Sequence, residues 1–256
     1  METITHQGRE TAYRRSDRGG DGTPLLCVHG SGGTNAVWKS QFRLADDRPV
    51  AALDLSGHGD SDDIDATAGY STLSAYADDV IAVAEETDAG VLVGNSLGGA
   101  VVMHVVLERE FDPEAVVLAG TGARLSVNED LLQWLASDWD RVVEFLHGPG
   151  RLFDDPDGDL AELSEQAMRE SGRAVTERDF RTCHTFDVRD RLDEIDVPAL
   201  AVVGANDRLT PPWFHEYLAD ELPDAALAVV EDAAHLAMLE QPRAFNSALE
   251  QFFEGL

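Results

Sequence analysis

The stretch Val91-Leu92-Val93-Gly94-Asn95-Ser96-Leu97-Gly98-Gly99 decides the fold expected for this chain. A short apolar run ends in the pattern G-x-S-x-G, and a helical pattern follows over residues 97–109. A serine on so sharp a strand-to-helix turn needs unfavourable backbone angles, and side chains at positions 94 and 98 would collide with the neighbouring turn. This context favours a nucleophile elbow that exposes Ser96 over the alternative of a chance glycine-rich helix start.

Other short apolar runs along the chain are typical of buried strands. They cover residues 24–28, 50–54, 115–119, 199–204 and 226–230. Amphipathic helical patterns separate them, and residues 2–15 fit two antiparallel strands at the sheet edge. The alternation predicts an α/β fold, with a mostly parallel sheet that carries helices on both faces.

One long segment breaks this alternation. Residues 121–190 contain no convincing buried strand, only helical patterns at 128–137, 140–147 and 159–171. The sequence therefore predicts a core made of residues 1–120 and 191–256, with residues 121–190 inserted as a helical cap. Aromatic side chains are frequent in this cap, and most of them are expected to form its own core.

A serine hydroxyl attacks well only when a base removes its proton and a carboxylate orients that base. Asp207 directly follows the run at 199–204, and His235 follows the run at 226–230. The carboxyl ends of parallel strands meet at one sheet edge, so Ser96, Asp207 and His235 are predicted to form a catalytic triad. Asp232 lies too near His235 in sequence to orient it easily.

An acyl-transfer site also needs donors for the oxyanion of its tetrahedral intermediate. The loop His29-Gly30-Ser31-Gly32-Gly33 follows the first buried strand, and we expect the backbone amides of Ser31 and Leu97 to form the oxyanion hole. His29 is expected to hydrogen-bond nearby backbone. A phosphate-binding loop is the rival interpretation, but the pattern G-x-x-x-x-G-K-[ST] is missing.

The composition is strongly acidic. The 256 residues carry 49 acidic and 19 basic side chains, a net charge of −30, and Lys39 is the only lysine. Without a basic patch, nucleic acid and anionic membranes are excluded as partners. Like-charge repulsion is screened at molar salt, where the Debye length is about 3 Å. The composition resembles that of proteins from salt-in halophiles, although flexible acidic loops in ordinary cytosol remain an alternative.

Cys27 and Cys183 lie far apart and are expected to be free thiols. The amino-terminal residues show no secretory signal pattern, and no apolar run approaches the roughly 18 residues of a membrane span. The sequence therefore predicts a soluble, cytoplasmic protein.

Taken together, the motifs resemble the α/β-hydrolase superfamily, in its lidded serine-hydrolase branch. The matching pieces are His29-Gly30-Ser31-Gly32, Asp54-Leu55-Ser56-Gly57-His58-Gly59-Asp60-Ser61, Gly94-Asn95-Ser96-Leu97-Gly98-Gly99, Gly204-Ala205-Asn206-Asp207, and His235 with Glu240-Gln241-Pro242. The resemblance implies an eight-stranded sheet, a cap inserted after the sixth strand, a structural bend at residues 54–61, and catalysis without a metal or other cofactor.

The expected activity is hydrolysis of a small, largely apolar carboxylic ester through an acyl-enzyme. Lactone, thioester and carbon–carbon bond hydrolysis are the alternatives, and a ligand-binding receptor or interaction module on the same fold is the non-enzymatic one. The partner is a small-molecule acyl substrate. We expect its pocket to be lined by apolar side chains, namely Trp38, Trp134, Trp139, Phe145, Trp213 and Met238.

Overall fold

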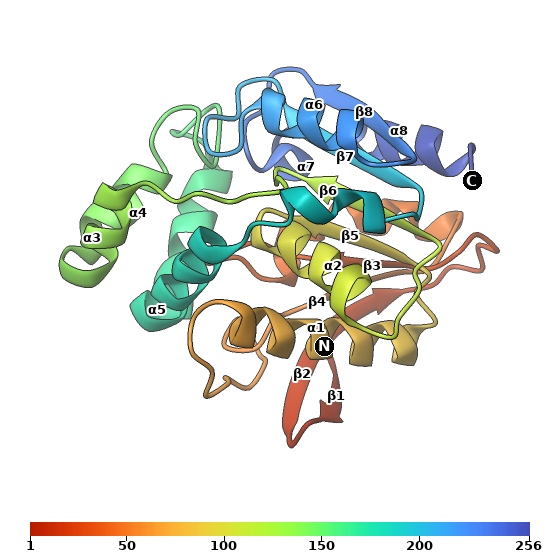
Figure 1. The fold of residues 1–256 in the computed structure, drawn as a ribbon, viewed down its shortest axis with the longest axis horizontal. Helices are drawn as coiled ribbons and strands as arrows, with labels where there is room; N and C mark the ends of the chain where they lie inside the picture. The colour runs from red at the N-terminus through yellow and green to blue at the C-terminus, as the bar shows by residue number, and fades with distance from the viewer.

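The computed structural model describes all residues, 1–256, and is built on one eight-stranded sheet with the order β1-β2-β4-β3-β5-β6-β7-β8 (Figure 1). The pairs β1–β2 and β2–β4 are antiparallel, and every other neighbouring pair is parallel. This confirms the predicted fold class, including the two antiparallel edge strands. The strands are β1 Glu2–His6, β2 Arg9–Ser16, β3 Leu25–Val28, β4 Val50–Leu53, β5 Val91–Asn95, β6 Ala115–Ala119, β7 Ala199–Gly204 and β8 Ala225–Val230.

Two apolar cores lie on the two faces of this sheet. Within β3, Leu26 and Val28 belong to one core while Leu25 and Cys27 belong to the other, as the alternation of side chains along a strand requires. The first core includes residues of α1, α2 and α6, and the second includes residues of α8. These helices are α1 Tyr70–Thr87, α2 Leu97–Glu108, α6 Pro212–Glu221 and α8 Pro242–Phe253; the short elements are α7 Ala237–Glu240, η1 Asn35–Trp38, η2 Gln41–Asp46 and η3 Arg189–Glu194.

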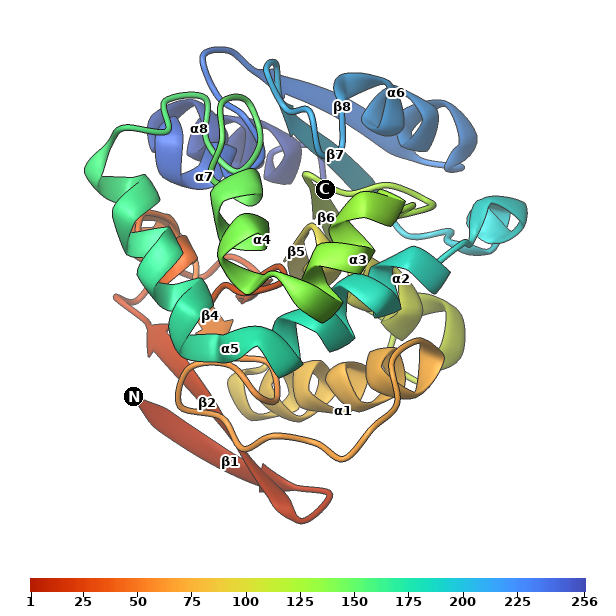
Figure 2. The ribbon, with the colours of Figure 1, turned by 90° about the vertical axis from the view of Figure 1, so that its left-hand side faces the viewer.

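Three helices, α3 Glu129–Ser137, α4 Trp139–Leu146 and α5 Asp159–Thr185, are inserted between β6 and β7. They lie together at one end of the sheet, and α5 crosses this end as a long bent helix (Figure 2). Its bend is at Gly172, where φ is 81° and ψ is 164°. We refer to residues 159–171 and 173–185 as the first and second segments of α5.

The second segment of α5 was missed in the sequence. The predicted helix at 159–171 ends at Gly172, which is where the backbone leaves helical geometry. Beyond it the buried positions are Val175, Thr176, Asp179, Thr182 and Cys183, so three of the five are polar. A buried helix face of this kind gives no apolar periodicity, and the pattern that reveals amphipathic helices is therefore absent.

The turn between β5 and α2 has the expected strained form. Ser96 has φ 55° and ψ −117°, an uncommon conformation for a residue with a side chain. A Cβ atom at Gly94 would lie 2.4 Å from the Gly98 carbonyl oxygen, and one at Gly98 would lie 2.4 Å from the Val28 carbonyl oxygen. The two glycines thus let β3, β5 and α2 approach closely enough to hold Ser96 in this conformation.

Two smaller expectations can also be compared with the structure. Cys27 and Cys183 are buried and unbonded, which confirms that both are free thiols. No helix combines the length and the apolar character needed to cross a membrane.

Candidate active site

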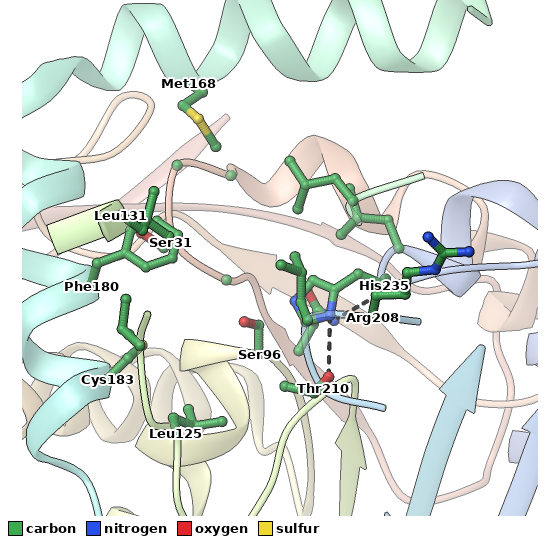
Figure 3. A pocket seen from close by; sticks show the side chains of 18 of the residues that line it. Ser31, Ser96, Leu125, Leu131, Met168, Phe180, Cys183, Arg208, Thr210 and His235 are labelled. Atoms are coloured by element: carbon green, nitrogen blue, oxygen red, sulfur yellow. Dashed lines mark hydrogen bonds between the residues drawn. The ribbon is translucent and has the colours of Figure 1, made fainter. Parts of the chain in front are cut away.

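Ser96 lies at the carboxyl end of β5 and borders a cavity of about 300 Å³ between the sheet and the inserted helices (Figure 3). Two backbone amides near it have no acceptor within the protein. Leu97 is the first residue of α2, where no preceding helical turn can accept its amide hydrogen. The Ser31 amide likewise donates no hydrogen bond. Both amides are therefore available to an oxygen atom bound beside Ser96.

Asp207 and His235 form a buried hydrogen-bonded pair at the same sheet edge. His235 Nδ1 lies 2.8 Å from Asp207 Oδ2. The carboxylate also accepts hydrogen bonds from the Leu209 amide at 2.8 Å and from the Thr210 amide at 3.0 Å and hydroxyl at 2.8 Å. Burial alone would raise the pKa of Asp207, but the neighbouring imidazole and the hydrogen bonds from Thr210 outweigh it and lower this pKa. Asp207 is thus an ionised acceptor that fixes the ring of His235.

The imidazole of His235 reaches the cavity that Ser96 borders (Figure 3). Its Nδ1 faces Asp207, which leaves Nε2 as the nitrogen able to take part in chemistry at the serine. The structure records no hydrogen bond between the Ser96 hydroxyl and the imidazole. Such contacts often tighten only in the complex with substrate, so their absence does not separate the two groups functionally.

The loop that carries His235 is held by polar contacts from Asn95 at the end of β5 and from Glu240 of α7. The Ala234 amide donates to Glu240 Oε2 at 2.7 Å, and Asn95 Nδ2 donates to the His235 carbonyl at 3.3 Å. Glu240 also accepts from the Asp154 amide of the inserted segment at 2.8 Å. In the sequence Glu240 stands out only as part of the Glu240-Gln241-Pro242 motif, and its link between the His235 loop and the inserted segment gives no sequence signal because its partners are backbone amides.

His29 holds the loop that presents the Ser31 amide. Its Nδ1 faces the Gly30 carbonyl oxygen at 2.8 Å, and its Nε2 accepts the Leu55 amide at 3.0 Å. One donor and one acceptor nitrogen describe a neutral ring. Burial, reinforced by the neighbouring His58, lowers the pKa of His29 to about 4. The expected structural role of His29 in bonding nearby backbone is confirmed.

The cavity wall is largely apolar, but most of it comes from residues other than those predicted. Phe145 is the one predicted pocket residue that lines it. Trp38 and Met238 are fully buried in the second core, where Trp38 packs against Phe245. The sequence interpretation is corrected for these two, because proximity in sequence to the predicted catalytic loops does not determine where a side chain points.

The remaining three predicted pocket residues also lie elsewhere. Trp134 packs edge-to-face against Phe145 from outside the cavity, and the Arg141 guanidinium lies over the Trp134 ring, 4.0 Å from the ring centroid. Trp139 is half-buried against the second core without reaching the cavity. Trp213, at the start of α6, is 62% exposed. Each side chain is part of its own helix surface instead of the cavity wall.

The apolar lining that the sequence missed comes from η1, α3, both segments of α5 and the start of α6, and from the loops after β6, α4, β7 and β8. These residues are Val37, Leu125, Val127, Leu131, Leu152, Met168, Phe180, Cys183, Leu209, Phe214 and Leu236. Helical spacing alone identifies such residues as buried, but which of them face a cavity depends on how the inserted helices pack. No Asp or Glu lines the cavity, and Arg208 is the only Lys or Arg side chain there. No group of three or more His, Cys, Asp and Glu side chains is arranged to hold a metal ion.

The family description "Alpha/beta hydrolase family" matches residues 25–248, and the chain belongs to this family of enzymes. It is 30% identical, over 91% of its length and 77% of the relative's, to a pimeloyl-[acyl-carrier protein] methyl ester esterase of Neisseria meningitidis. It is 27% identical to 3-oxoadipate enol-lactonase 2 of Acinetobacter baylyi, over 97% of this chain and 95% of that protein. A solved thermophilic esterase matches with a TM-score of 0.86 and 28% identity, covering 99% of this chain and 97% of that one.

Proposed function

We propose that this hydrolase cleaves a small, largely apolar carboxylic ester through a Ser96–His235–Asp207 triad. The observation that carries the proposal is the strained serine at the end of β5, which shares one cavity with a histidine oriented by a buried carboxylate. A strained residue over-determined by its surroundings is typical of functional sites. The names of the relatives, two esterases and an enol-lactonase, support hydrolysis of an ester or cyclic ester bond.

In the proposed mechanism, Ser96 Oγ attacks the acyl carbonyl carbon while His235 Nε2 accepts the hydroxyl proton. The carbonyl oxygen becomes an oxyanion that receives hydrogen bonds from the amides of Ser31 and Leu97. When the C–O bond breaks, His235 returns the proton to the leaving alcohol and an acyl-serine remains. Water, deprotonated by His235, then attacks this acyl-serine and releases the acid, which restores the Ser96 hydroxyl.

The cavity supports the proposed substrate class. Its volume of about 300 Å³ is at the lower end for small-molecule sites, and half of its 24 lining residues are hydrophobic. Residues 121–190 act as a cap over it, since Leu131, Phe145, Met168 and Phe180 contribute to its wall. A cyclic ester fits the same chemistry, so lactone hydrolysis is the second candidate, favoured by the likeness to an enol-lactonase.

Labelling by a fluorophosphonate probe tests the enzyme proposal. The intact protein is expected to be labelled at Ser96, and Ser96→Ala is expected to lose both labelling and hydrolysis of p-nitrophenyl esters. A panel of short-chain and long-chain esters, lactones, thioesters and a dienone then ranks the substrate classes by kcat/KM. Unlabelled protein, or undiminished hydrolysis by Ser96→Ala, would contradict the triad and favour a ligand-binding module on this fold.

We further propose that the protein works at high salt in a cytoplasm. The net charge of −30 lies outside the cavity wall, whose lining includes no acidic side chain. Most ion pairs join exposed partners, as in Arg169 with Asp140 and Arg18 with Asp46. Because exposed ion pairs stabilise a protein only weakly, they cannot offset the repulsion among the many carboxylates at low salt. Thermal unfolding measured from dilute buffer to molar KCl should show Tm rising with salt. Full stability and activity in dilute buffer would overturn this proposal.

A further inference from the structure

The inserted helix α5 touches the loop of residues 29–33 at two points, one on each side of its bend. In the first segment, Met168 packs so closely on Gly32 that a Cβ atom at that position would lie 2.9 Å from Met168 Cε. In the second segment, Asp179 Oδ2 accepts a hydrogen bond from Ser31 Oγ at 3.1 Å. The bend at Gly172 lets one helix wrap this loop. Met168 of the first segment and Phe180 of the second segment line the same cavity as Ser31 (Figure 3).

Asp179 itself is immobilised by partners from other parts of the molecule. Its side chain is fully buried, with His58 Nε2 at 3.0 Å from Oδ2 and the Tyr76 hydroxyl at 2.7 Å from Oδ1. His58 Nδ1 also faces a carbonyl oxygen, that of Ser56, at 3.3 Å. Because both ring nitrogens face acceptors, both must donate, and His58 is therefore an imidazolium paired with an ionised carboxylate.

Arg178, next to Asp179 in the sequence, fixes the second segment of α5 on the 54–69 region and on Tyr76 of α1. Arg178 Nη2 donates to Asp63 Oδ1 at 2.7 Å and to the Tyr76 hydroxyl at 3.2 Å, while Nη1 donates to the Ile64 carbonyl at 3.1 Å. The Gly69 amide donates to Thr182 Oγ1 at 2.9 Å. The carboxylate of Asp179 is thus held by the core of the protein even though it belongs to an inserted helix.

From these contacts we propose that Asp179 is a positioning residue for the oxyanion hole: it holds the Ser31 side chain and thereby aims the Ser31 amide at the substrate. The inference rests on the proposed function, in which this amide stabilises the oxyanion. The inserted segment then completes the active site in addition to covering it. Glycines flank Ser31 on both sides, so its own position depends on the hydrogen bond from its hydroxyl to Asp179, in addition to the contacts by which His29 and Met168 hold the loop.

The test compares three variants that remove different hydrogen bonds of the Asp179 network. Ser31→Ala keeps the backbone amide and removes only its side-chain anchor, and Asp179→Asn removes the charged acceptor. Tyr76→Phe is the matched control, because it removes a hydrogen bond to the other oxygen of the same carboxylate and leaves the Ser31 contact intact. Each is measured for kcat, KM, Tm and inhibition by a trifluoromethyl ketone, whose serine adduct places an oxyanion in the hole.

Ser31→Ala and Asp179→Asn should each lower kcat about 10- to 100-fold with KM within about 2-fold, because an oxyanion contact is made in the transition state and small misplacements are costly. The inhibition constant of the ketone should rise by a similar factor. Tyr76→Phe should lower Tm and leave kcat and the inhibition constant within about 2-fold. In the double variant Ser31→Ala/Asp179→Asn, the two effects should not multiply, since both remove one contact.

Three outcomes would overturn the inference. The first is a kcat of Ser31→Ala that is no lower than the kcat of Tyr76→Phe. The second is a double variant in which the kcat losses of Ser31→Ala and Asp179→Asn multiply in full. The third is a ketone inhibition constant that stays unchanged in Ser31→Ala. If Asp179→Asn fails to fold, the kcat and the ketone inhibition constant of Ser31→Ala still test the inference. Failure of the proposed function is distinct, because it would leave Ser96→Ala active whatever these variants do.

Discussion

The molecule contains two buried pairs of histidine and aspartate with nearly the same nitrogen–oxygen distance and different surroundings. His235 and Asp207 lie 2.8 Å apart at the ends of β8 and β7, and His58 and Asp179 lie 3.0 Å apart between the 54–61 loop and α5. The exposed fractions of the side chains are nearly the same in the two pairs: 4% for His235 and 0% for Asp207, and 0% for both His58 and Asp179. Burial alone therefore does not distinguish the pair that we propose as catalytic from a pair that only holds structure in place.

The two pairs differ in the histidine ring nitrogen that does not face the aspartate. In His235 one nitrogen faces Asp207 and the other is left for the cavity, whereas both nitrogens of His58 face oxygen acceptors. Burial alone would lower the pKa of His58, but the charge and hydrogen bond of Asp179 overcome it and raise this pKa. A histidine locked in its protonated form cannot accept a proton from a nucleophile, so the second pair can only hold structure in place.

The largest effect is expected from the same substitution in both aspartates. Asp207→Asn should lower kcat about 10⁴-fold, because the amide no longer selects the tautomer of His235 that can accept a proton at Nε2. Asp179→Asn should lower it far less, about 10- to 100-fold, since it acts only through the position of Ser31. Steady-state kinetics on one activated ester measures both. Equal losses would remove the distinction between the pairs.

When the two histidines are replaced by phenylalanine and stability is measured, we expect the larger loss in the His58–Asp179 pair. His58→Phe leaves the Asp179 carboxylate buried without its cationic partner, and breaking such a pair typically costs about 3–5 kcal/mol of unfolding free energy. His235→Phe should cost less, because its site borders a cavity where water can reach Asp207. Urea unfolding at constant KCl measures both. A greater loss in His235→Phe would show that the roles are misassigned.

A smaller effect is expected from pH, which weakens the second pair without removing it. Because the pKa of His58 is raised, its stabilising contribution is complete below the unfolded value of about 6.5 and is lost as the pH rises through the folded value. Burial by itself raises the pKa of Asp179, but His58, Tyr76 and Arg178 outweigh it and lower this pKa, so its contribution is lost only as the pH falls through the folded value.

The measurement is the difference in unfolding free energy between the parent protein and His58→Phe, followed upward from pH 6.5. This difference should shrink as the pH rises. The ring centroid of His29 lies 4.8 Å from that of His58, and burial together with His58 lowers the pKa of His29 to about 4, so His29 is neutral above pH 6.5 in the parent protein. The other charged and titratable groups facing the pair are Tyr76 of α1, Arg178 of α5, and Asp54 and Asp63 of the adjoining loop. A difference that stays constant to high pH would mean that His58 carries no charge.

The first pair could be predicted from the sequence because a parallel sheet does most of the positioning. Asp207 and His235 each directly follow an apolar run that forms a strand, so their meeting at one edge follows from the topology. Asp179 gave no such signal. It is 121 residues from His58 and lies in a helix segment whose buried face is largely polar, so only the packing of α5 on the core brings it to Ser31.

The residues of the cavity wall could not be predicted from the sequence either. Replacing Trp213, which was predicted to line the cavity, should have the smallest effect. Trp213 is 62% exposed, so Trp213→Ser should change the unfolding free energy by no more than about 0.5 kcal/mol and kcat/KM by less than about 2-fold. Phe145→Ala, in the cavity wall, is the contrasting variant and should lower kcat/KM about 10-fold or more for an apolar acyl group. Trp213 does not line the cavity, but it packs against Phe214, which does, with the two ring centroids 4.1 Å apart. If Trp213→Ser altered the ranking of substrates as strongly as Phe145→Ala, the start of α6 would have to move against the cavity when substrate binds, and Trp213 would then belong to the cavity wall.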